Sequence, residues 1–177
     1  MSQCHKVRRE SGFTLIETMV AIVVLTIGLM SVAALMGQMV TSSADSRYFS
    51  IASVLASEKL EDLNRFPSND PNVAAGGNLA GTPAGYSDTV QISTGSGAIT
   101  ETTNGITVTH APDGTVTTVA GAAPAPTADT LTFARNWVIE KDAPVPGVRR
   151  ITVLVTLTSK GLGPSKPVTF QTSTVRP

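Results

Sequence analysis

The order of hydrophobic and polar residues divides the chain into an apolar stretch, an amphipathic stretch and a longer region of short alternating segments. Residues 12–40 are almost uniformly apolar, with one charged residue, Glu17, and no proline. A hydrocarbon core about 30 Å thick is crossed by roughly 20 apolar residues in a helix, so this stretch predicts a single membrane-spanning helix. A carboxylate inside such a helix costs about 2.5–3.5 kcal/mol on insertion scales. The sequence therefore predicts that Glu17 has a compensating partner.

From residue 41 to residue 66 the apolar positions recur at steps of three and four, which is the spacing of one helix face. The residues on this face are Phe49, Ala52, Ala56, Leu60 and Leu63. No helix breaker separates them from the apolar stretch, and the first proline is Pro67. We therefore predict one helix from Phe13 to about Phe66, roughly 80 Å long at 1.5 Å per residue. Its second half is expected to pack on a globular head.

Residues 67–130 are predicted to form a loop after the helix and then an irregular β region. Asn72–Gly85 is rich in glycine and small residues, which is typical of a loop. The other predicted segments are a strand at Tyr86–Ser93, a loop at Thr94–Gly105, a hairpin of Ile106–Thr109 and Thr115–Val119 around Pro112-Asp113-Gly114, and a linker at Ala120–Ala128. This region is expected to add a strand and a hairpin to the head.

Residues 131–177 predict an antiparallel β meander. Its expected strands are Leu131–Glu140, Arg149–Thr158 and Val168–Val175, with a turn at Gly161–Pro167. The middle strand alternates apolar residues with mostly threonine, so the sheet has one apolar face that needs a cover. The amphipathic half of the helix supplies that cover, which makes the fold class α+β. The predicted core includes Leu60, Leu63, Trp137, Val153 and Val155.

Charge and motif content argue against several classes of function. The 177 residues include 13 basic and 13 acidic ones, and residues 1–12 hold three of the basic and one of the acidic residues. The rest of the chain therefore has a net charge of −2, which does not predict a nucleic-acid-binding surface. No phosphate-binding loop of P-loop spacing is present, and no motif places a base beside a serine or threonine. We expect no enzyme, no catalytic residue and no cofactor.

Histidine, acidic residues and cysteine do not predict a metal site or a disulfide. The histidines are His5 and His110, and His110 is expected at the surface because a metal site needs several convergent ligands. Asp113-Gly114 is expected in a turn, since the spaced acidic ligands of a calcium loop are missing. The only cysteine is Cys4, so the chain beyond residue 12 has no thiol and its stability must come from packing.

The residues in front of the apolar stretch carry a more specific signal. Three basic residues, Lys6, Arg8 and Arg9, precede Gly12, and Phe13-Thr14-Leu15-Ile16-Glu17 follows. This pattern resembles the type IV pilin family, which includes the pseudopilins of type II secretion. The resemblance implies that residues 1–12 are a prepilin leader, that prepilin peptidase cleaves between Gly12 and Phe13, and that the new Phe13 amine is methylated.

The same resemblance implies a role in assembly for Glu17. Cleavage would create an ammonium group at Phe13, and Glu17 lies one helical turn further along on the same face. The two charges can pair within one subunit or between neighbouring subunits, and their attraction is stronger at low dielectric than in water. Residues 13–40 would then be the transmembrane and filament-core half of the helix, and residues 41–66 its amphipathic half.

The resemblance also implies a location and partners. The expected partners are the lipid bilayer, prepilin peptidase, an inner-membrane assembly platform, and other major and minor pilins, with no nucleic acid. The basic leader favours a cytoplasmic N-terminus, which places the head in the periplasm and, after assembly, on the pilus or cell surface. The aromatic strand followed by Arg149-Arg150-Ile151-Thr152-Val153 resembles minor pilins of the PilV type. Many major pilins, however, have a C-terminal disulfide that this chain lacks.

The leading interpretation is a minor pilin that enters or initiates a type IV pilus and supports its assembly, attachment or twitching motility. A pseudopilin of a type II secretion system remains an alternative, and so does a membrane-anchored extracytoplasmic binding protein that does not assemble. An ordinary secretory signal peptide with cleavage at Ser31-Val32-Ala33 is a further alternative. It leaves Glu17 unexplained, and the apolar stretch continues to Val40.

Overall fold

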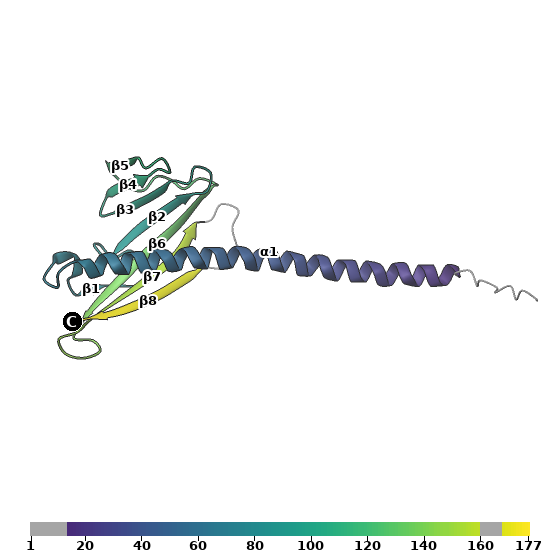
Figure 1. Cartoon of the computed structure of the whole chain (residues 1–177), viewed down its shortest axis with the longest axis horizontal. Helices are drawn as coiled ribbons and strands as arrows, with labels where there is room; N and C mark the ends of the chain where they lie inside the picture. Colours follow the sequence, from purple (N-terminus) through teal and green to yellow (C-terminus); the bar gives the residue numbers. More distant parts are fainter. Residues whose placement is uncertain (1–13, 160–167) are drawn as a thin grey trace, which may run out of the picture. The chain divides into compact units, whose positions relative to one another are not determined.

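A computed structural model describes residues 14–159 and 168–177 of the chain. Residues 1–13, with the predicted leader, cleavage site and methylation site, lie outside this range, as does the whole of the turn predicted at Gly161–Pro167. The chain divides into two compact units, residues 1–41 and residues 42–177. Helix α1, Leu15–Arg65, contributes to both (Figure 1).

Helix α1 is a single α-helix of 51 residues, which confirms the predicted continuous helix and its end just before Pro67. In the first unit, every residue from Thr14 to Thr41 is exposed. Large apolar side chains here keep between 51% and 77% of their surface accessible, the extremes being Val32 and Leu15. Such exposure over a long apolar segment means that this unit needs lipid or other helices around it.

The second unit contains an eight-stranded sheet in which every pair of neighbouring strands is antiparallel. Its strands are β1 Gly76–Gly77, β2 Ser87–Ser93, β3 Ile99–Thr103, β4 Ile106–His110, β5 Val116–Ala120, β6 Thr130–Lys141, β7 Arg149–Ser159 and β8 Thr169–Arg176, and a short 3-10 helix, η1, covers Pro71–Val73. The strand order is β5-β4-β3-β2-β6-β7-β8, and β1 also pairs with β6. This arrangement confirms the α+β fold class and the antiparallel meander of the last three strands.

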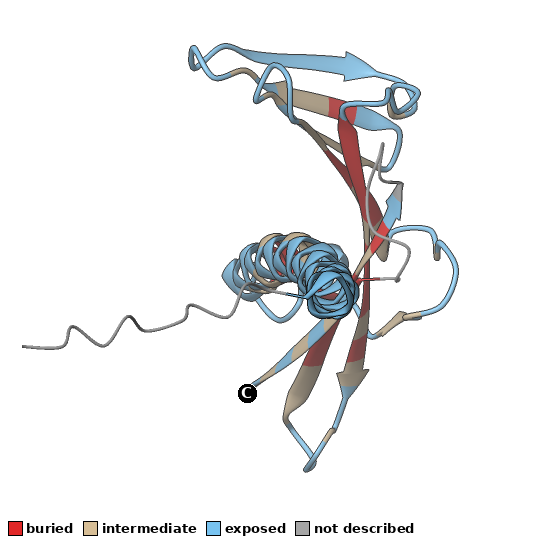
Figure 2. Cartoon of the chain, turned by 90° about the vertical axis from the view of Figure 1, so that its right-hand side faces the viewer, coloured by how far each residue is buried: buried red, intermediate tan, exposed pale blue. Residues whose placement is uncertain are grey.

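The core forms where α1 packs on one face of the central strands. In β7 the side chains of Ile151, Val153 and Val155 alternate along one face and are fully buried. The buried apolar residues are Ala52, Leu55, Ala56, Leu63, Val73, Val90, Leu131, Phe133, Trp137, Ile139, Ile151, Val153, Val155, Leu157 and Val168. Figure 2 shows that buried residues concentrate in the central strands and become rare toward β5.

The predicted helix face was close to the observed one. Ala52, Ala56 and Leu63 are buried as expected, and Leu60 is half-buried at the margin of the core. Phe49 is an exception, since half of its surface is exposed, although its ring meets Phe170 of β8 edge-on at 5.3 Å between centroids. Leu55, which the predicted face did not include, is buried.

The loop predicted at Thr94–Gly105 is wrong in its second half, where β3 lies. This strand, Ile99–Thr103, pairs with β2 and β4. The turn to β4 is Asn104-Gly105, and both residues have positive φ angles, 51° and 76°. Asn-Gly is the preferred sequence for a two-residue hairpin turn of this kind. The Ser, Thr and Gly content that suggested a loop is compatible with a strand here because threonine favours β structure.

The region 67–130 is therefore more regular than predicted. The predicted loop at Asn72–Gly85 overlaps η1 and contains β1, whereas the strand at Tyr86–Ser93 and the hairpin around Pro112-Asp113-Gly114 are confirmed. The linker after β5 returns from the sheet edge to the central strand β6. On its way it accepts hydrogen bonds from two sheet residues, Gln91 to the Pro124 carbonyl at 2.8 Å and Thr107 to the Gly121 carbonyl at 3.1 Å.

Candidate functional site

Glu17 occupies the first turn of α1. The backbone N–H groups of Glu17 and Thr18 donate to the Thr14 carbonyl, at 3.0 and 3.2 Å, and the Glu17 N–H also approaches the Thr14 hydroxyl at 3.4 Å. An acidic side chain in the first turn interacts favourably with the positive end of the helix dipole. The position of Glu17 is therefore compatible with helix initiation, independently of any partner.

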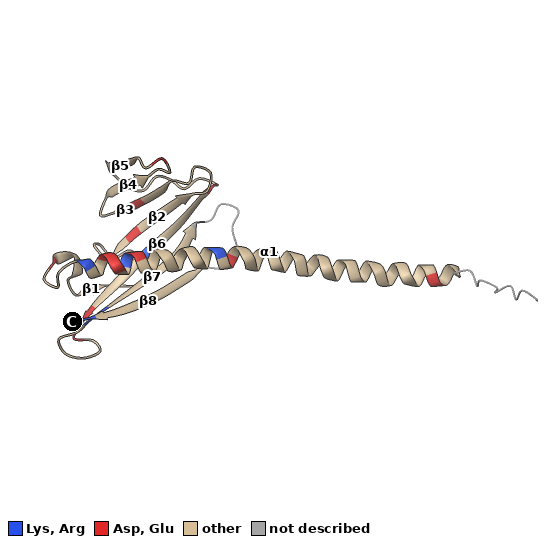
Figure 3. Cartoon of the chain, in the orientation of Figure 1, with Lys and Arg blue, Asp and Glu red and all other residues tan. Residues whose placement is uncertain are grey.

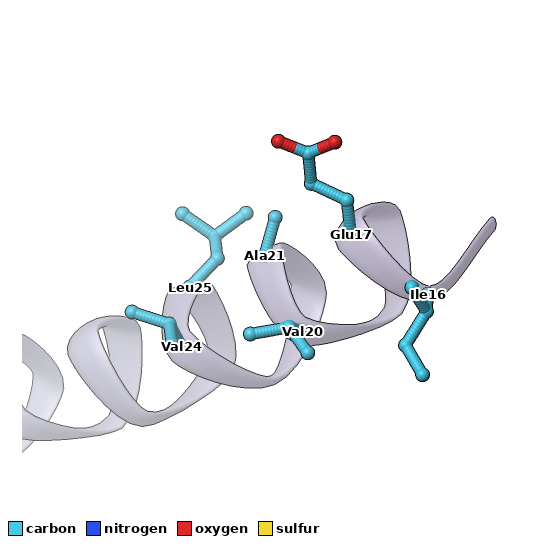
Figure 4. A pocket seen from close by; sticks show the side chains of 6 residues that line it. All are labelled: Ile16, Glu17, Val20, Ala21, Val24 and Leu25. Carbon is cyan, nitrogen blue, oxygen red and sulfur yellow. The ribbon is translucent and has the colours of Figure 1, made fainter. Parts of the chain in front are cut away.

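An apolar surface surrounds this carboxylate. Figure 4 shows Glu17, Ala21 and Leu25 pointing to the same side of the helix, as expected for residues four apart. Ile16, Val20 and Val24 line the adjoining surface. Glu17 is the only charged residue between positions 14 and 44 (Figure 3). A lone carboxylate thus lies on a surface that is otherwise suited to lipid or to the apolar faces of other helices.

No basic side chain in the described part of α1 can reach the carboxylate of Glu17. The first basic residue along the helix is Arg47, 30 positions from Glu17, which corresponds to about 45 Å at 1.5 Å per residue. Among residues 14–159 and 168–177, Glu17 takes part in no ion pair. A counter-charge for Glu17 has to come from the N-terminal residues outside this range or from another molecule.

The second unit contains a group of charged residues that the sequence did not predict. Arg135 of β6 donates two hydrogen bonds to Asp88 of β2, at 2.6 and 2.8 Å, and it also pairs with Glu101 of β3. Lys59 of α1 lies 2.8 Å from the same Asp88 carboxylate and 4.0 Å from Glu101. Its ammonium group also sits 4.5 Å from the centre of the Trp137 ring, a favourable cation–π arrangement.

This ion cluster of Lys59, Asp88, Glu101 and Arg135 is neutral and largely buried. The side chain of Asp88 has no exposed surface and that of Arg135 only 2%. Burial by itself lowers the pKa of the Arg135 guanidinium, but the hydrogen bond to Asp88 and the charges of Asp88 and Glu101 raise that pKa overall. The four charges therefore pair within the cluster, which joins α1 to the sheet.

The remaining candidate chemistry is sparse. Within the described residues, no group of three or more histidine, cysteine or acidic side chains is placed to hold a metal ion. His110 is exposed, as predicted, at the end of β4. Asp113 lies in the β4–β5 turn, where its carboxylate accepts a hydrogen bond from the Thr115 N–H at 2.8 Å. Arg149, at the start of β7, donates to the Val73 carbonyl at 2.8 Å.

Of the three predicted site residues, only Glu17 lies within the described part of the chain. Gly12 and Phe13 lie outside the described residues, whereas Glu17 is at the start of a fully exposed apolar helix. Sequence reasoning missed the ion cluster because its members are up to 76 positions apart and belong to four different elements. The one available signal was Arg135, a charged residue within the apolar strand Thr130–Lys141.

Comparison with known proteins identifies the N-terminal signal. Residues 7–33 match the family model of the prokaryotic N-terminal methylation motif. Among curated proteins and among solved structures, none matches the chain significantly. The matched region begins in the basic segment and includes Glu17 and helix α1 as far as Ala33. A prepilin-type motif of this kind supports a type IV pilin or a pseudopilin, which are structural proteins rather than enzymes.

Proposed function

We propose that this chain is a minor pilin that enters or initiates a type IV pilus and supports its assembly, attachment or twitching motility. The observation that carries the proposal is the N-terminal methylation motif at residues 7–33, which leads into an exposed apolar helix with a single acid in its first turn. A separate compact head follows. An anchored protein that never assembles needs an apolar helix, but it has no need for an acid on that helix.

In this proposal prepilin peptidase removes residues 1–12 by cutting between Gly12 and Phe13, and the new amine of Phe13 is methylated. Phe13 and Glu17 are four positions apart, which places them on one helix face. The Phe13 ammonium of a neighbouring subunit, or of the same subunit, supplies the positive charge for Glu17. In an apolar helix bundle an unpaired charge is costly, so this pairing selects the axial position of each incoming subunit.

Before assembly the apolar half of α1 spans the inner membrane, with the N-terminus in the cytoplasm and the head in the periplasm. The three basic residues of the leader favour this orientation. An inner-membrane assembly platform then transfers the subunit into the fibre beside major and other minor pilins. The apolar surface that lipid covered becomes the contact surface with neighbouring helices.

A charge-specific series at Glu17 tests the proposal. Glu17→Ala removes the carboxylate, Glu17→Asp shortens it, and Glu17→Gln keeps its size and its ability to cap the helix but removes its charge. We expect wild-type amounts of Glu17→Ala and Glu17→Gln in the inner membrane but at least a tenfold loss from sheared pili, with Glu17→Asp intermediate. Normal incorporation of Glu17→Gln would show that Glu17 serves only the helix start.

Two further measurements separate the alternatives. Intact-mass analysis of the membrane-extracted protein should show loss of residues 1–12 and one added methyl group on Phe13. A chain that begins at Ala34 would identify an ordinary signal peptide instead. Absence of the wild-type protein from sheared pili, with a secretion defect in the deletion strain, would identify a pseudopilin.

A further inference from the structure

The two edge strands of the sheet differ in their contacts with the rest of the chain. The strand order ends in β5 on one side and in β8 on the other. At the β8 edge, Arg176 donates to the carbonyls of Leu63 and Phe66, at 3.3 and 2.8 Å, and Phe170 meets the ring of Phe49. Helix α1 and the residue after it therefore contact β8, whose residues alternate between exposed and half-buried, whereas all five residues of β5 are exposed.

The hairpin of β4 and β5 determines which backbone groups of β5 face outward. Ala111 donates to the Thr115 carbonyl at 2.9 Å and Gly121 donates to the Gly105 carbonyl at 2.8 Å, at the two ends of this hairpin. Hydrogen-bonded and non-hydrogen-bonded pairs alternate in an antiparallel ladder. Thr117 and Val119 therefore bond to β4. The N–H and C=O groups of the other three residues, Val116, Thr118 and Ala120, point to the free edge.

Strand β5 lacks the features that usually protect an edge strand from pairing. Natural edges carry charged side chains, proline or a bulge. The sequence Val-Thr-Thr-Val-Ala of β5 has no charge and no proline, and its register with β4 is uninterrupted. Its valines and threonines favour pairing with a further strand. The backbone and the side chains of this edge are thus both suited to strand addition.

The sheet face beside this edge is apolar and uncovered. The register connects Ile99 of β3 to Ile92 of β2 and then to Leu131 of β6, so Ile99 lies on the face that carries the core. Ile106 and Val116 continue this face outward, and these two side chains remain 52% and 56% exposed. Any strand that adds to β5 would extend the face and cover part of its apolar surface.

We propose that β5 pairs with β5 of a second copy of this chain, in an antiparallel register centred on Thr118. In this register the outward-facing groups form hydrogen-bonded pairs, Thr118 with Thr118 of the second copy and Val116 with Ala120 of the second copy. Val116 then lies beside Ala120 of the second copy, whose own β4 neighbour is Ile106. No charge opposes another. The pairing needs only the head, so it does not depend on the proposed function.

Cysteine cross-linking of the full-length chain in its membrane tests both the pairing and its register. Cys4 is the only cysteine, so a Cys4→Ser background leaves single introduced thiols. Hydrogen-bonded antiparallel pairs have Cα atoms about 5.5 Å apart, which suits a disulfide. We expect Thr118→Cys to form a disulfide-linked dimer when diamide oxidises the two thiols. Ser173→Cys, on the exposed face of β8, serves as the control and should stay monomeric.

The register makes a second prediction with two different variants. Two copies of Val116→Cys are offset by four residues along the paired strands, about 13 Å, and should not cross-link. Co-expressed Val116→Cys and Ala120→Cys should cross-link, because these positions lie opposite each other. Dimers of Val116→Cys alone, or equal cross-linking of Ser173→Cys, would overturn the proposed register. A monomeric Thr118→Cys protein at wild-type membrane levels would overturn the pairing itself.

Charge at the centre of the pair provides a rescue experiment. Thr118→Lys in both the Val116→Cys and the Ala120→Cys copies places two ammonium groups side by side, and we expect at least a tenfold loss of cross-linking. Changing one of the two copies to Thr118→Glu instead should restore it. Loss without rescue would contradict the proposal, because Thr118 would then not face its counterpart.

Discussion

The carboxylates of Glu17 and Asp88 lie in different units of this chain and differ in their burial and in their basic partners. Asp88 lies in the head with a fully buried side chain, and both Arg135 and Lys59 reach it within 2.8 Å. Glu17 lies on an exposed apolar helix on which the nearest base is 30 positions away. The head therefore neutralises its buried acid internally, whereas residues 14–41 do not.

The apolar surfaces of the two units follow the same distinction. In the head, α1 and the central strands cover each other and leave residues such as Phe133 and Val153 with no exposed surface. In the first unit the apolar side chains are exposed along the whole segment. The core and the ion cluster of the head are thus formed by residues of the head itself. The apolar helix needs other molecules to cover its side chains, and Glu17 needs a counter-charge from outside the described part of that helix.

The largest effect is expected from removing Arg135. Arg135→Ala leaves Asp88 buried with Lys59 as its only close base, and breaking such a pair typically costs roughly 3–5 kcal/mol. Urea unfolding of the full-length chain in detergent micelles can be followed by the fluorescence of Trp137, the only tryptophan. The double variant Arg135→Met, Asp88→Leu should recover most of the loss, since Lys59 and Glu101 still face each other. A wild-type midpoint for Arg135→Ala would contradict the described cluster.

A slightly smaller effect is expected from truncating a core residue of the helix. Leu63 is 3% exposed, and Leu→Ala in a packed core costs about 2–5 kcal/mol. The matched control is Leu25→Ala, the same change in the first unit, which should leave the Trp137 unfolding transition where it is. Equal shifts for the two variants would remove the distinction between the two units.

The surface ion pair of Arg150 and Glu140 should shift the pKa of Glu140 and contribute little to the stability of the head. Arg150 lies 2.6 Å from Glu140, and this hydrogen bond, with the attraction of the two charges, lowers the pKa of Glu140 below its usual value. In Arg150→Met we expect the Glu140 pKa, measured by NMR titration, to rise toward that value. Since the folded-state pKa is lowered, the pair stabilises the head above the unfolded-state pKa, and its contribution disappears as the pH falls through the folded-state pKa.

The smallest effect is expected from removing the first unit altogether. Residues 42–177 contain every buried apolar residue of the described core, so this fragment should be soluble and should unfold at the same urea concentration as the head of the full chain. An unfolded or insoluble fragment would mean that the apolar helix contributes to the stability of the head.

Local patterns in the sequence were sufficient for the helix and for most strands. The continuous apolar stretch, the three- and four-residue spacing after it and the stop before Pro67 predicted α1 to within two residues at either end. The alternation in Arg149–Thr158 predicted β7, observed at Arg149–Ser159, and its buried face. These signals are readable because a helix or strand repeats its own geometry along the chain.

Only the tertiary structure decided which strands pair and how the charges of the head are used. Strand β3 was missed because its threonine-rich sequence is also typical of a loop. Its pairing with β2 and β4 makes it a strand. Lys59 and Arg135 appeared in the sequence as isolated charges, and only the packing of α1 on the sheet brought them to Asp88. The sequence alone determined the apolar helix and the motif around Glu17, because both depend on neighbouring residues. The ion cluster and the free β5 edge depend on contacts between distant ones.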